Sequence, residues 1–593
     1  IFGSPKENQL EAFANLDYIQ EDFRNVERTY NIEFSRDWNV PLLPQGDQTF
    51  LTTGLHYSEN EHTDISYRFE NLSYSGNYSG NRHSFLGAYT GSKLRANLNT
   101  SFLNTRADTA STRFFRLHSR AIYDLGKPWV GAMVNAEDNV QEDAAGVNPL
   151  SQRFQAYEVF TGLGDSTAVF AEIGYRYRVN DSVRSNSLQR VNTSNTYYLK
   201  SQFVQSENTR LGLFVNYRNL KYTEDQRENE QSINSRLIYD QSLFDQIVRW
   251  NTVFETSSGT LPRQEFTYVN VDEGQGTHTW NDYNNDGVQQ LQEFEIAQFQ
   301  DQADYIRVLL PNRVFVKTHQ NKLSQLLTLN PQQWSGQEGV KKFLSHFYNQ
   351  TSYLIDRRVL REGNVFNLNP FASSDNELSL NLSVRNTLFF NRGTQKYTTS
   401  YTYLSTQNTN LLSIGLQEND LRSHQFNFLH KVKESYLLNF KSEAGTNSSS
   451  SENFEQRNFE LKTIDFQPKV SYLFNEQSRV EAFYGYGKKE NQLGDQEALT
   501  QQDLGIAFSF ANAAKLSLNG ELKYINNDFT GSAFSPVSYQ MLEGLQPGTN
   551  FTWSLIGQRR LTQFLDLNIS YFGRKSETTR TIHTGTVQLR AFF

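Results

Sequence analysis

The feature that most constrains the fold of this chain is an alternation of apolar and polar residues with a period of two. In residues 93–102, Leu94, Ala96 and Leu98 alternate with basic and amide side chains. Because successive side chains of a β-strand point to opposite faces, this pattern predicts a strand with one apolar and one polar face. The same alternation recurs in residues 166–178, 515–524, 565–574 and 580–593. The sequence therefore predicts an all-β protein.

The expected strands are longer than those of soluble sheets. They cover about 10 to 15 residues each, whereas strands of soluble proteins cover about 5 to 6, and a tilted strand crosses a bilayer in about 9 to 11. A soluble antiparallel sheet also alternates and is the alternative. The sequence shows no helical segment long enough to cover a large apolar face, and no apolar run long enough for a membrane-spanning helix. We therefore expect lipid to cover the apolar face.

Composition narrows the class further. Only 37% of the residues are hydrophobic and the mean hydropathy is −0.64, yet the chain contains 44 Phe and 31 Tyr. Disordered chains lack such aromatic residues, so this chain is expected to fold. The absence of cysteine excludes disulfides, thiolate nucleophiles and cysteine metal sites. The net charge of −8 is spread without a basic stripe, so nucleic acid is not an expected partner.

The ends of the expected strands predict how they are connected. In lipid every backbone N–H and C=O must find a partner, so the strands are expected to close into an antiparallel transmembrane β-barrel. Bacterial barrels keep periplasmic turns short and extracellular loops long. Short breaks at 390–395, 431–434, 475–478 and 511–514 alternate with longer ones at 361–374, 446–452, 488–498 and 528–548. This parity predicts long loops outside an outer membrane and both chain ends in the periplasm.

Counting back to Thr29 predicts about 26 strands, within a range of about 24 to 28, which is inside the range of such barrels. Residues 1–28 carry a mildly helical pattern and are expected to form a periplasmic or luminal segment, with the barrel over 29–593. The chain opens at Ile1 without a basic and apolar leader, so we expect a processed chain or a fragment.

A barrel of this circumference encloses an aqueous channel unless something fills it, because the diameter grows with the number of strands. No segment is long and globular enough to be an evident plug domain. Inward loops, residues 1–28 or another protein would have to fill the lumen.

The longest break in the strand pattern, residues 257–311, is expected to be an extracellular loop. It contains one motif that could bind a metal ion. Residues 282–293 match the calcium-loop pattern D-x-[DN]-x-[DN]-G-x5-E at every specified position. Ca²⁺ prefers hard oxygen ligands, and Gly287 permits the sharp turn between them. The expected ligands are Asp282, Asn284, Asp286, Val288 through its carbonyl, Gln290 directly or through water, and Glu293.

The alternative for this motif is a polar loop in which Asn285, Asp286 and Gly287 only form a turn. No clear helix precedes the motif, so a bound ion is expected to pin the loop and not to signal. The ten histidines show no H-E-x-x-H spacing, and no glycine-rich phosphate loop occurs. We therefore expect no enzyme activity.

Two further segments, Gly276 to Phe299 and Tyr539 to Gly585, resemble stretches that recur in very large outer-membrane proteins of the Bacteroidota. A related aspartate and asparagine loop occurs in the giant translocon barrel of the type nine secretion system, to which this chain is distantly similar. The resemblance implies an outer-membrane location in such a bacterium and a larger precursor with periplasmic domains upstream of Ile1. It implies no particular function.

Three functions remain open. The expected width and polar lumen favour a transport or secretion pore that is plugged or gated by a partner. Long aromatic-rich loops favour a non-conducting scaffold of a cell-envelope or surface-protein assembly. The same loops could stack on sugar rings in a glycan or nutrient uptake barrel, although no plug or energy-coupling box is visible. The expected partners are outer-membrane lipid, lipopolysaccharide, and proteins such as a plug, a lipoprotein or secretion and assembly subunits.

Overall fold

The computed structural model describes residues 8–23, 34–40, 46–59, 62–108, 110–165, 168–223, 228–284, 286–361, 363, 365–372, 376–394, 396–412, 415–512 and 516–592. In this part of the chain there are 29 strands, which pair antiparallel with one another. Three of them have only two or three residues, so 26 strands have ten residues or more. The prediction of an all-β antiparallel fold with about 26 long strands is confirmed, and closure into a barrel stays a prediction.

The chain divides into two compact units, residues 1–238 and 239–593, and each is described by itself. The elements of unit 1 are β1 (Asn8–Ile19), α1 (Phe34–Asp37), β2 (Gln48–Glu59), β3 (Thr63–Tyr74), β4 (Tyr78–Thr90), β5 (Leu94–Ala107), β6 (Ala110–Asp124), β7 (Pro128–Asp143), β8 (Gly146–Val147), β9 (Gln152–Gly164), β10 (Phe170–Arg184), β11 (Ser187–Gln205) and β12 (Thr209–Tyr222). The strand β13 (Glu230–Leu243) crosses the boundary between the units.

Unit 2 contains the remaining strands and most of the short helices. Its elements are β14 (Val248–Asn270), β15 (His278–Trp280), η1 (Leu291–Glu293), β16 (Phe294–Ile296), η2 (Gln300–Gln302), β17 (Tyr305–Leu329), η3 (Pro331–Gly336), α2 (Val340–Leu344), β18 (Phe347–Leu360), β19 (Glu377–Phe390), β20 (Tyr397–Leu412), β21 (Gly415–Val432), β22 (Tyr436–Ser451), η4 (Glu455–Arg457), β23 (Phe459–Leu473), β24 (Ser478–Asn491), β25 (Ala498–Asn512), β26 (Leu516–Thr530), α3 (Pro536–Leu542), β27 (Gly548–Thr562), β28 (Leu565–Ser576) and β29 (Ile582–Ala591). None of the described helices is long and apolar enough to cross a membrane.

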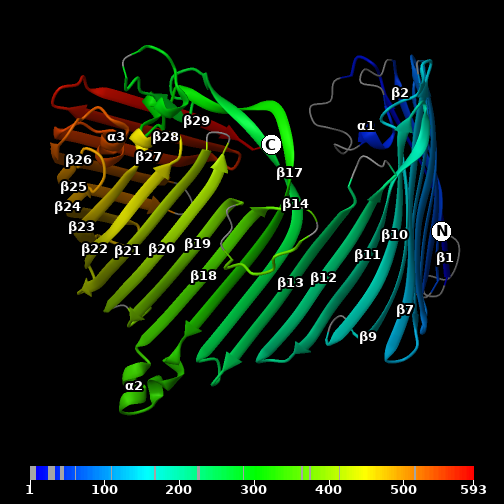
Figure 1. The fold of residues 1–593 in the computed structure, drawn as a ribbon, viewed down its shortest axis with the longest axis horizontal. Helices are drawn as coiled ribbons and strands as arrows, with labels where there is room; N and C mark the ends of the chain where they lie inside the picture. Colours follow the sequence, from blue (N-terminus) through cyan, green and yellow to red (C-terminus); the bar gives the residue numbers. More distant parts are fainter. Residues whose placement is uncertain are drawn as a thin grey trace. The chain divides into compact units, whose positions relative to one another are not determined.

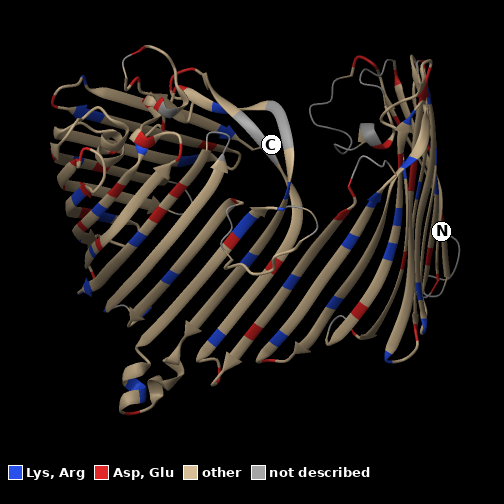
Figure 2. Cartoon of the chain, in the orientation of Figure 1, with Lys and Arg blue, Asp and Glu red and all other residues tan. Residues whose placement is uncertain are grey.

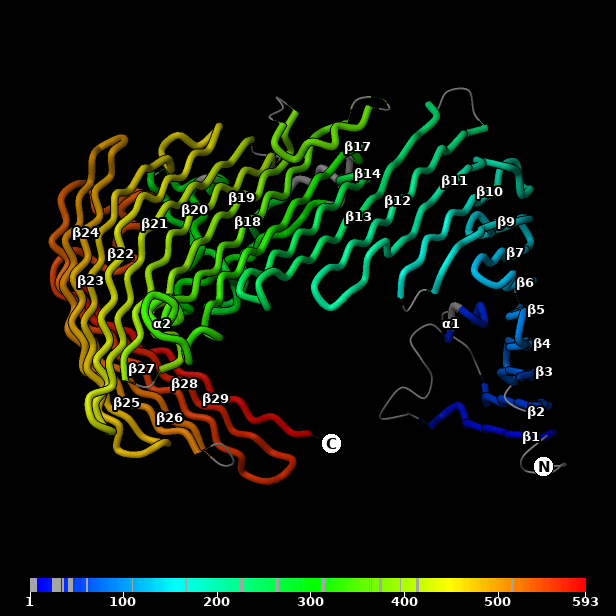
Figure 3. The backbone as a smooth tube through the Cα atoms, turned by 90° about the horizontal axis from the view of Figure 1, so that it is seen from below, coloured from blue at the N-terminus to red at the C-terminus, as the bar shows by residue number. Residues whose placement is uncertain are grey.

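Within each unit the strands follow one another as a meander (Figures 1 and 3). In unit 1 each strand from β1 to β7 pairs with the next, β7 pairs with β9, and the series continues to β12, while β8 pairs with the end of β7. In unit 2, β14 pairs with β17, and each strand from β17 to β29 pairs with the next.

The two faces of the long strands differ in character, as unit 1 shows in β9 and β10. Val159 and Ile173 stand on one face and are 58% and 57% exposed. Glu158 points to the other face, where its carboxylate accepts hydrogen bonds from Arg176 (2.6 Å) and Tyr198 (2.6 Å). We call these the apolar face and the polar face. A soluble sheet would instead bury its apolar face against a core.

Unit 2 repeats this arrangement. Ile506, Leu522 and Trp553 are cross-strand neighbours on the apolar face of β25, β26 and β27, and Ile506 is 56% exposed. Glu521 and Lys523 point to the polar face and form an ion pair of 3.0 Å. Charged residues accordingly occur along the strands themselves and not only in the connections (Figure 2). The period of two in the sequence therefore produces the same two-faced strands in both units.

The expectation for residues 1–28 needs a correction, because β1 is a strand and not a helical segment. Its twelve residues pair in register with β2, from Asn8 with Glu59 to Ile19 with Gln48. Leu10 and Phe13 are three residues apart, a spacing that also suits a helix, but all twelve residues pair with β2, and this pairing decides the conformation. Residues 1–7 and 24–28 lie outside the described residues. One of the 26 long strands thus precedes Thr29.

The alternation of short and long connections is present in unit 2, with shifted boundaries and with two of the four long loops shorter than expected. The long connections span 361–376, 452–458, 492–497 and 531–547, and the short ones span 391–396, 433–435 and 474–477. The expected turn 511–514 falls partly on residues 513–515, which lie outside the described residues. The expected loops 446–452, 488–498 and 528–548 begin too early, because polar strand ends such as Ser448 and Asn491 still pair in the ladder.

Two connections differ from the expected pattern. The excursion expected over 257–311 is irregular only over 271–304, because β14 and β17 continue as a paired ribbon to Asn270 and from Tyr305. The connection 330–346, with η3 and α2, is long but lies at the end of the sheet that otherwise carries short turns. Phe347 at the start of β18 pairs with Phe390, which precedes the short turn 391–396. The connection 330–346 therefore lies at the same end of the sheet as that turn.

In unit 1 a short segment lies on the polar face. Trp38, which follows α1, is 1% exposed and packs against Leu72 and Phe114. The guanidinium of Arg82 stacks over its ring at 4.3 Å, and Arg82 also pairs with Glu70 at 2.7 Å. Part of the polar face is thus covered by residues 34–40 of the chain itself.

Candidate metal centre

The calcium-like motif lies in the excursion of unit 2, between two short strands. β15 and β16 pair through His278 with Ile296 and Trp280 with Phe294, so the residues between them form a closed loop. The backbone N–H of Asn281 donates to the carbonyl of Glu293 (3.0 Å) and closes the loop at its base. This hairpin brings the first and last acidic positions of the motif to the same place.

Three carboxylates converge inside this loop. Oxygens of Asp282, Asp286 and Glu293 all lie within 4.8 Å of one another. Like charges at this separation repel each other, and a divalent cation between them would turn that repulsion into attraction. Asp286 is exposed and Asp282 is half-buried, whereas Glu293 is 1% exposed. The structure thus brings together three of the six residues expected to bind the ion.

Backbone N–H groups orient the carboxylates at the start of the loop. Asp282 accepts hydrogen bonds from the N–H of Asp286 (3.2 Å) and Gly287 (2.9 Å). Asp286 in turn accepts from the N–H of Val288 (2.7 Å). Gly287 has φ of +68°, a conformation that costs glycine little. The motif glycine therefore allows the chain to turn around the acidic cluster.

The two expected amide ligands lie next to Asp286. Its Oδ2 accepts hydrogen bonds from Asn284 Nδ2 (3.0 Å) and Gln290 Nε2 (2.7 Å). A cation would need these amides to present their oxygens instead, and Asn284 Oδ1 accepts a hydrogen bond from the Asp286 N–H (3.0 Å). Val288 is exposed and contributes its backbone N–H to the loop. Asn285 lies outside the described residues.

Glu293 is held in place by groups outside the acidic cluster. Its Oε2 accepts hydrogen bonds from the indole N–H of Trp280 (2.8 Å) and the backbone N–H of Gln290 (3.2 Å). The last ligand of the motif is therefore fixed before any ion binds. Carboxylates, carboxamides and one glycine turn in a single loop form a donor set that suits Ca²⁺.

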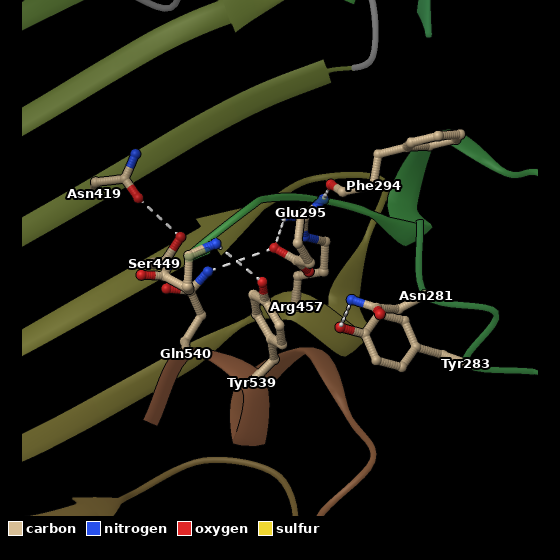
Figure 4. Close-up of polar contacts among 10 residues, drawn as sticks. Asn281, Tyr283, Phe294, Glu295, Asn419, Ser449, Arg457, Tyr539 and Gln540 are labelled. Carbon is tan, nitrogen blue, oxygen red and sulfur yellow. Dashed lines mark hydrogen bonds and ion pairs between the residues drawn. The ribbon is translucent and has the colours of Figure 1, made fainter. Parts of the chain in front are cut away.

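The excursion is also tied to other loops of unit 2, as Figure 4 shows. Arg457 of η4 donates to Glu295 (2.8 Å) and to the carbonyl of Phe294 (3.3 Å), directly beside the metal motif. Gln540 of α3 donates to the same Glu295 carboxylate (3.4 Å). Burial raises the pKa of Glu295, and the nearby Arg457 opposes this shift.

A second set of contacts fixes the far end of the excursion. Asp301 accepts two hydrogen bonds from Arg574 of β28, at 2.7 and 2.8 Å, and both side chains are largely buried. The Arg574 guanidinium also lies over the ring of Phe299 at 4.0 Å. The hydroxyl of Tyr539 accepts from the backbone N–H of Gln298 (3.2 Å).

The helix α3 provides the other half of this contact surface. Ser535 caps its first turn by accepting from Ser538 N–H, and Pro536 occupies the first helical position. Its apolar side packs Met541, which is fully buried, against Leu461 and Leu499. Leu499 shares a face with Asp503, four residues further along β25, so α3 lies on the polar face of the sheet. Arg574 also stands on that face, in one row with Thr552 and Lys523.

We call residues 271–304 together with α3 the inner cap. Its parts were visible in the sequence only as two separate segments with a shared resemblance, Gly276 to Phe299 and Tyr539 to Gly585. The structure shows that these segments contact each other through Gln298 and Tyr539. The residues that join them, above all Arg457, Asp301 and Arg574, carried no motif in the sequence. Their role in attaching the excursion is seen only in the structure, where Arg457 contacts Glu295 across 162 residues of chain and Arg574 contacts Asp301 across 273.

Comparisons with known proteins add little to this geometry. No model of a protein family matches the sequence, and no curated protein sequence matches it. Among solved structures, the chain overlaps the ferric preacinetobactin receptor BauA from Acinetobacter baumannii with a TM-score of 0.31 and 9% identity, covering 89% of this chain and 78% of that one. The siderophore receptor PirA from Pseudomonas aeruginosa follows with 0.29 and 9%, covering 94% and 81%. The outer membrane transporter YddB from Escherichia coli has 0.30 and 7%, covering 92% and 84%. Overlaps at these TM-scores carry no argument about this chain.

Proposed function

We propose that this chain is a wide outer-membrane β-barrel that forms a transport or secretion pore, with its polar face lining the passage and the inner cap narrowing it. The observation that supports the proposal most strongly is the exposure of large apolar side chains on one face of long strands whose other face is charged. Val159 and Ile173 in unit 1 and Ile506 in unit 2 are more than half exposed. Such a face is stable against lipid, and closure of the strands would leave no open edge there.

The inner cap supports a gated pore over an open channel. In unit 2 the excursion and α3 both lie on the polar face, where the proposed passage runs. The cap is held by the ion pairs of Arg457 and Arg574 and by the cluster around Met541. Inward loops of the chain were one of the three expected ways to fill the lumen, and the cap is such a set of loops. Secretion, partner gating and the periplasmic position of the chain ends are parts of this proposal.

We also propose that Asp282, Asn284, Asp286, Val288, Gln290 and Glu293 bind Ca²⁺, and that the ion has a structural role. The converging carboxylates and the turn at Gly287 support it. Glu293 is followed at once by Phe294 and Glu295, which carry the contacts to Arg457. An ion bound to Glu293 would therefore stiffen the segment that attaches the cap to η4.

The pore is tested by single-channel conductance of the purified chain in planar bilayers. We expect low or no conductance for the wild-type chain and larger, longer openings for Arg574→Gln, because this change breaks the buried pair with Asp301. The matched control is Arg580→Gln, an exposed residue in the connection between β28 and β29. Wild type and Arg574→Gln that both leave the bilayer sealed would contradict the pore. Equal conductance of all three variants would contradict the role of the cap.

A non-conducting scaffold is the alternative that one observation favours. The chain covers parts of its own polar face in each unit, with residues 34–40 in unit 1 and the inner cap in unit 2. A chain built only as a scaffold would stay sealed in every cap variant and would be purified from its native membrane with stoichiometric protein partners. Opening by Arg574→Gln alone would argue against it.

A further inference from the structure

A second segment of unit 2 folds back onto the sheet, but on the opposite face. We call residues 365–372, in the connection between β18 and β19, the outer flap. Asn321 Nδ2 of β17 donates to the carbonyl of Asn367 (2.6 Å). Arg357 of β18 donates to the carbonyls of Pro370 (3.2 Å) and Ala372. Three backbone carbonyls of the flap are thus bound by side chains of two neighbouring strands.

The register shows that the outer flap covers the apolar face. Asn321 and Arg357 are cross-strand partners, so their side chains share one face of the sheet. Two residues further along each strand, Leu323 and Ile355 form the next pair on that face. The pair of Leu323 and Ile355, next to the flap, is therefore apolar. The flap begins at the pair of Asn321 and Arg357, where the apolar face of the sheet becomes polar.

The position of the flap along the strands corresponds to one bilayer thickness. The stretch of β17 from His319, below the flap, to Leu329 at the other end of the sheet has eleven residues. A tilted strand needs about 9 to 11 residues to cross a bilayer. With the apolar face in lipid, His319 then lies at the level of the lipid headgroups. The flap lies at the end that carries the long connections.

A polar cavity of about 330 Å³ lies between the flap and the strands. Its described lining contains two guanidinium groups, from Arg357 and Arg361, and Arg357 forms an ion pair with Glu377 at 2.7 Å. The remaining lining is formed by His319, Asn321, Val359, Leu360, Val365, Asn367, Asn369, Ala372 and Asn376. Guanidinium and carboxamide N–H groups are the donors that bind phosphate oxygens well.

The outward side of the flap is apolar to an unusual degree for a surface loop. Val365 is 76% exposed, Phe371 58% and Leu368 47%. Contiguous exposed apolar patches mark sites of interaction with proteins or membranes. At the edge of a bilayer these three side chains would enter the acyl region while the cavity stays at the headgroups.

We propose that the cavity under the outer flap binds the anionic, phosphate-bearing headgroup of an outer-leaflet lipid, whose acyl chains lie along Leu323, Ile355 and the flap. The Arg361 guanidinium in the lining, the depth along β17 and the apolar exterior of the flap support such a lipid. The proposal rests on the proposed function, because it needs the apolar face of the sheet to lie in a membrane. It names a specific binding site on that face.

The experiment measures lipid retained by the purified full-length chain after reconstitution and re-extraction, by native mass spectrometry. The probes are vesicles of phosphatidylcholine alone and phosphatidylcholine doped with lipopolysaccharide or with phosphatidylglycerol. We expect one tightly retained lipopolysaccharide per chain, and about tenfold weaker retention by Arg361→Gln, because a hydrogen bond to a charged group is lost. Arg361→Lys should recover part of the binding, and Phe371→Ser should weaken it without changing the charge.

Several outcomes would overturn the inference. Equal loss in the control Arg580→Gln would indicate non-specific charge attraction. Equal retention of phosphatidylcholine would show that the headgroup is not recognised, and displacement by inorganic phosphate at low millimolar concentration would identify a free anion site. Selective retention of phosphatidylglycerol would assign the site to the other leaflet. A chain that conducts and inserts but retains no lipid would refute this inference alone, whereas a chain that fails to insert would refute the proposed function.

Discussion

The inner cap, which is formed by two connections, and the outer flap, which is formed by one, belong to the same unit and fold back onto opposite faces of one sheet. The cap is attached by side-chain ion pairs, such as Asp301 with Arg574, and by the apolar cluster around Met541. The flap is attached mainly through its backbone carbonyls, which accept hydrogen bonds from Asn321 and Arg357. The cap and the flap are thus held to the sheet by different kinds of contact.

The difference extends to what each segment exposes. The exposed residues of the excursion are mostly polar, with Val288 and Ile296 as the large apolar exceptions, whereas the flap exposes Val365, Leu368 and Phe371. A segment that covers a polar face buries apolar groups and presents polar ones, and a segment that covers an apolar face does the reverse. The two segments therefore match two different surroundings, which is what water on one side and lipid on the other require.

Loss of the Arg574 anchor is the change with the largest expected effect. Arg574→Gln leaves Asp301 as a buried carboxylate without its charged partner, which should loosen the excursion by about 3 kcal/mol. Hydrogen exchange should then accelerate in residues 298–304 and stay unchanged in 365–372. Faster exchange in both segments would show that the cap and the flap are coupled.

The Arg357 anchor provides the converse test on the flap. Arg357→Gln removes the donor to two flap carbonyls and the ion pair with Glu377 (2.7 Å), and should weaken flap attachment by about 2 kcal/mol. Limited proteolysis in detergent should cut within 365–372 and spare the inner cap. A flap that stays resistant would show that the hydrogen bond from Asn321 and the ring contact between Phe366 and His319 suffice to hold it.

Calcium should affect the cap and not the flap. An ion at one hundred times its dissociation constant would stabilise the loop by about 2.7 kcal/mol, so chelation should increase proteolysis within 281–293. Asp286→Asn should abolish this calcium effect, and Asp272→Asn, in the same excursion but outside the motif, should preserve it. A cleavage pattern that does not respond to chelator would leave Asp286 and Gly287 as a simple turn.

A smaller effect is expected from pH at Glu295. Burial raises the pKa of this carboxyl in the folded cap, and its Oε1 has no hydrogen-bond partner among the described residues. The folded cap therefore binds a proton more readily than the loosened one, so this contribution is complete below the unfolded pKa and is lost as the pH rises through the folded pKa. Hydrogen exchange at 294–296 should be slower in mild acid. Glu295→Gln should remove that dependence, and a variant with unchanged pH dependence would assign it to another group.

Much of the fold could be predicted from the sequence because its pattern is local. The alternation of residues such as Leu94, Ala96 and Leu98 requires two faces whatever the partner strand, and the lengths of the breaks between such stretches indicate which connections are short and which are long. Two errors had the same origin. β1 and the ribbon of β14 and β17 have weak or interrupted patterns, and only pairing with a neighbouring strand decides that they are strands.

The candidate site could be predicted only in part. The loop from Asp282 to Glu293 carries its motif within twelve consecutive residues, and the structure brings its three acidic side chains together. The contacts that attach it to the sheet could not be predicted, because Arg457 and Arg574 are single charges in unremarkable polar stretches.

The sequence by itself determined that the chain forms long antiparallel strands with an apolar and a polar face, since a period of two has no other regular explanation. Tertiary structure alone decided which connections fold back and which face each one covers. The pair of Asp301 and Arg574 joins positions 273 residues apart, and the flap depends on a row that β17 and β18 form together. A repeat of two residues carries no information over such distances, so the location of the cap and the flap belongs to the folded sheet.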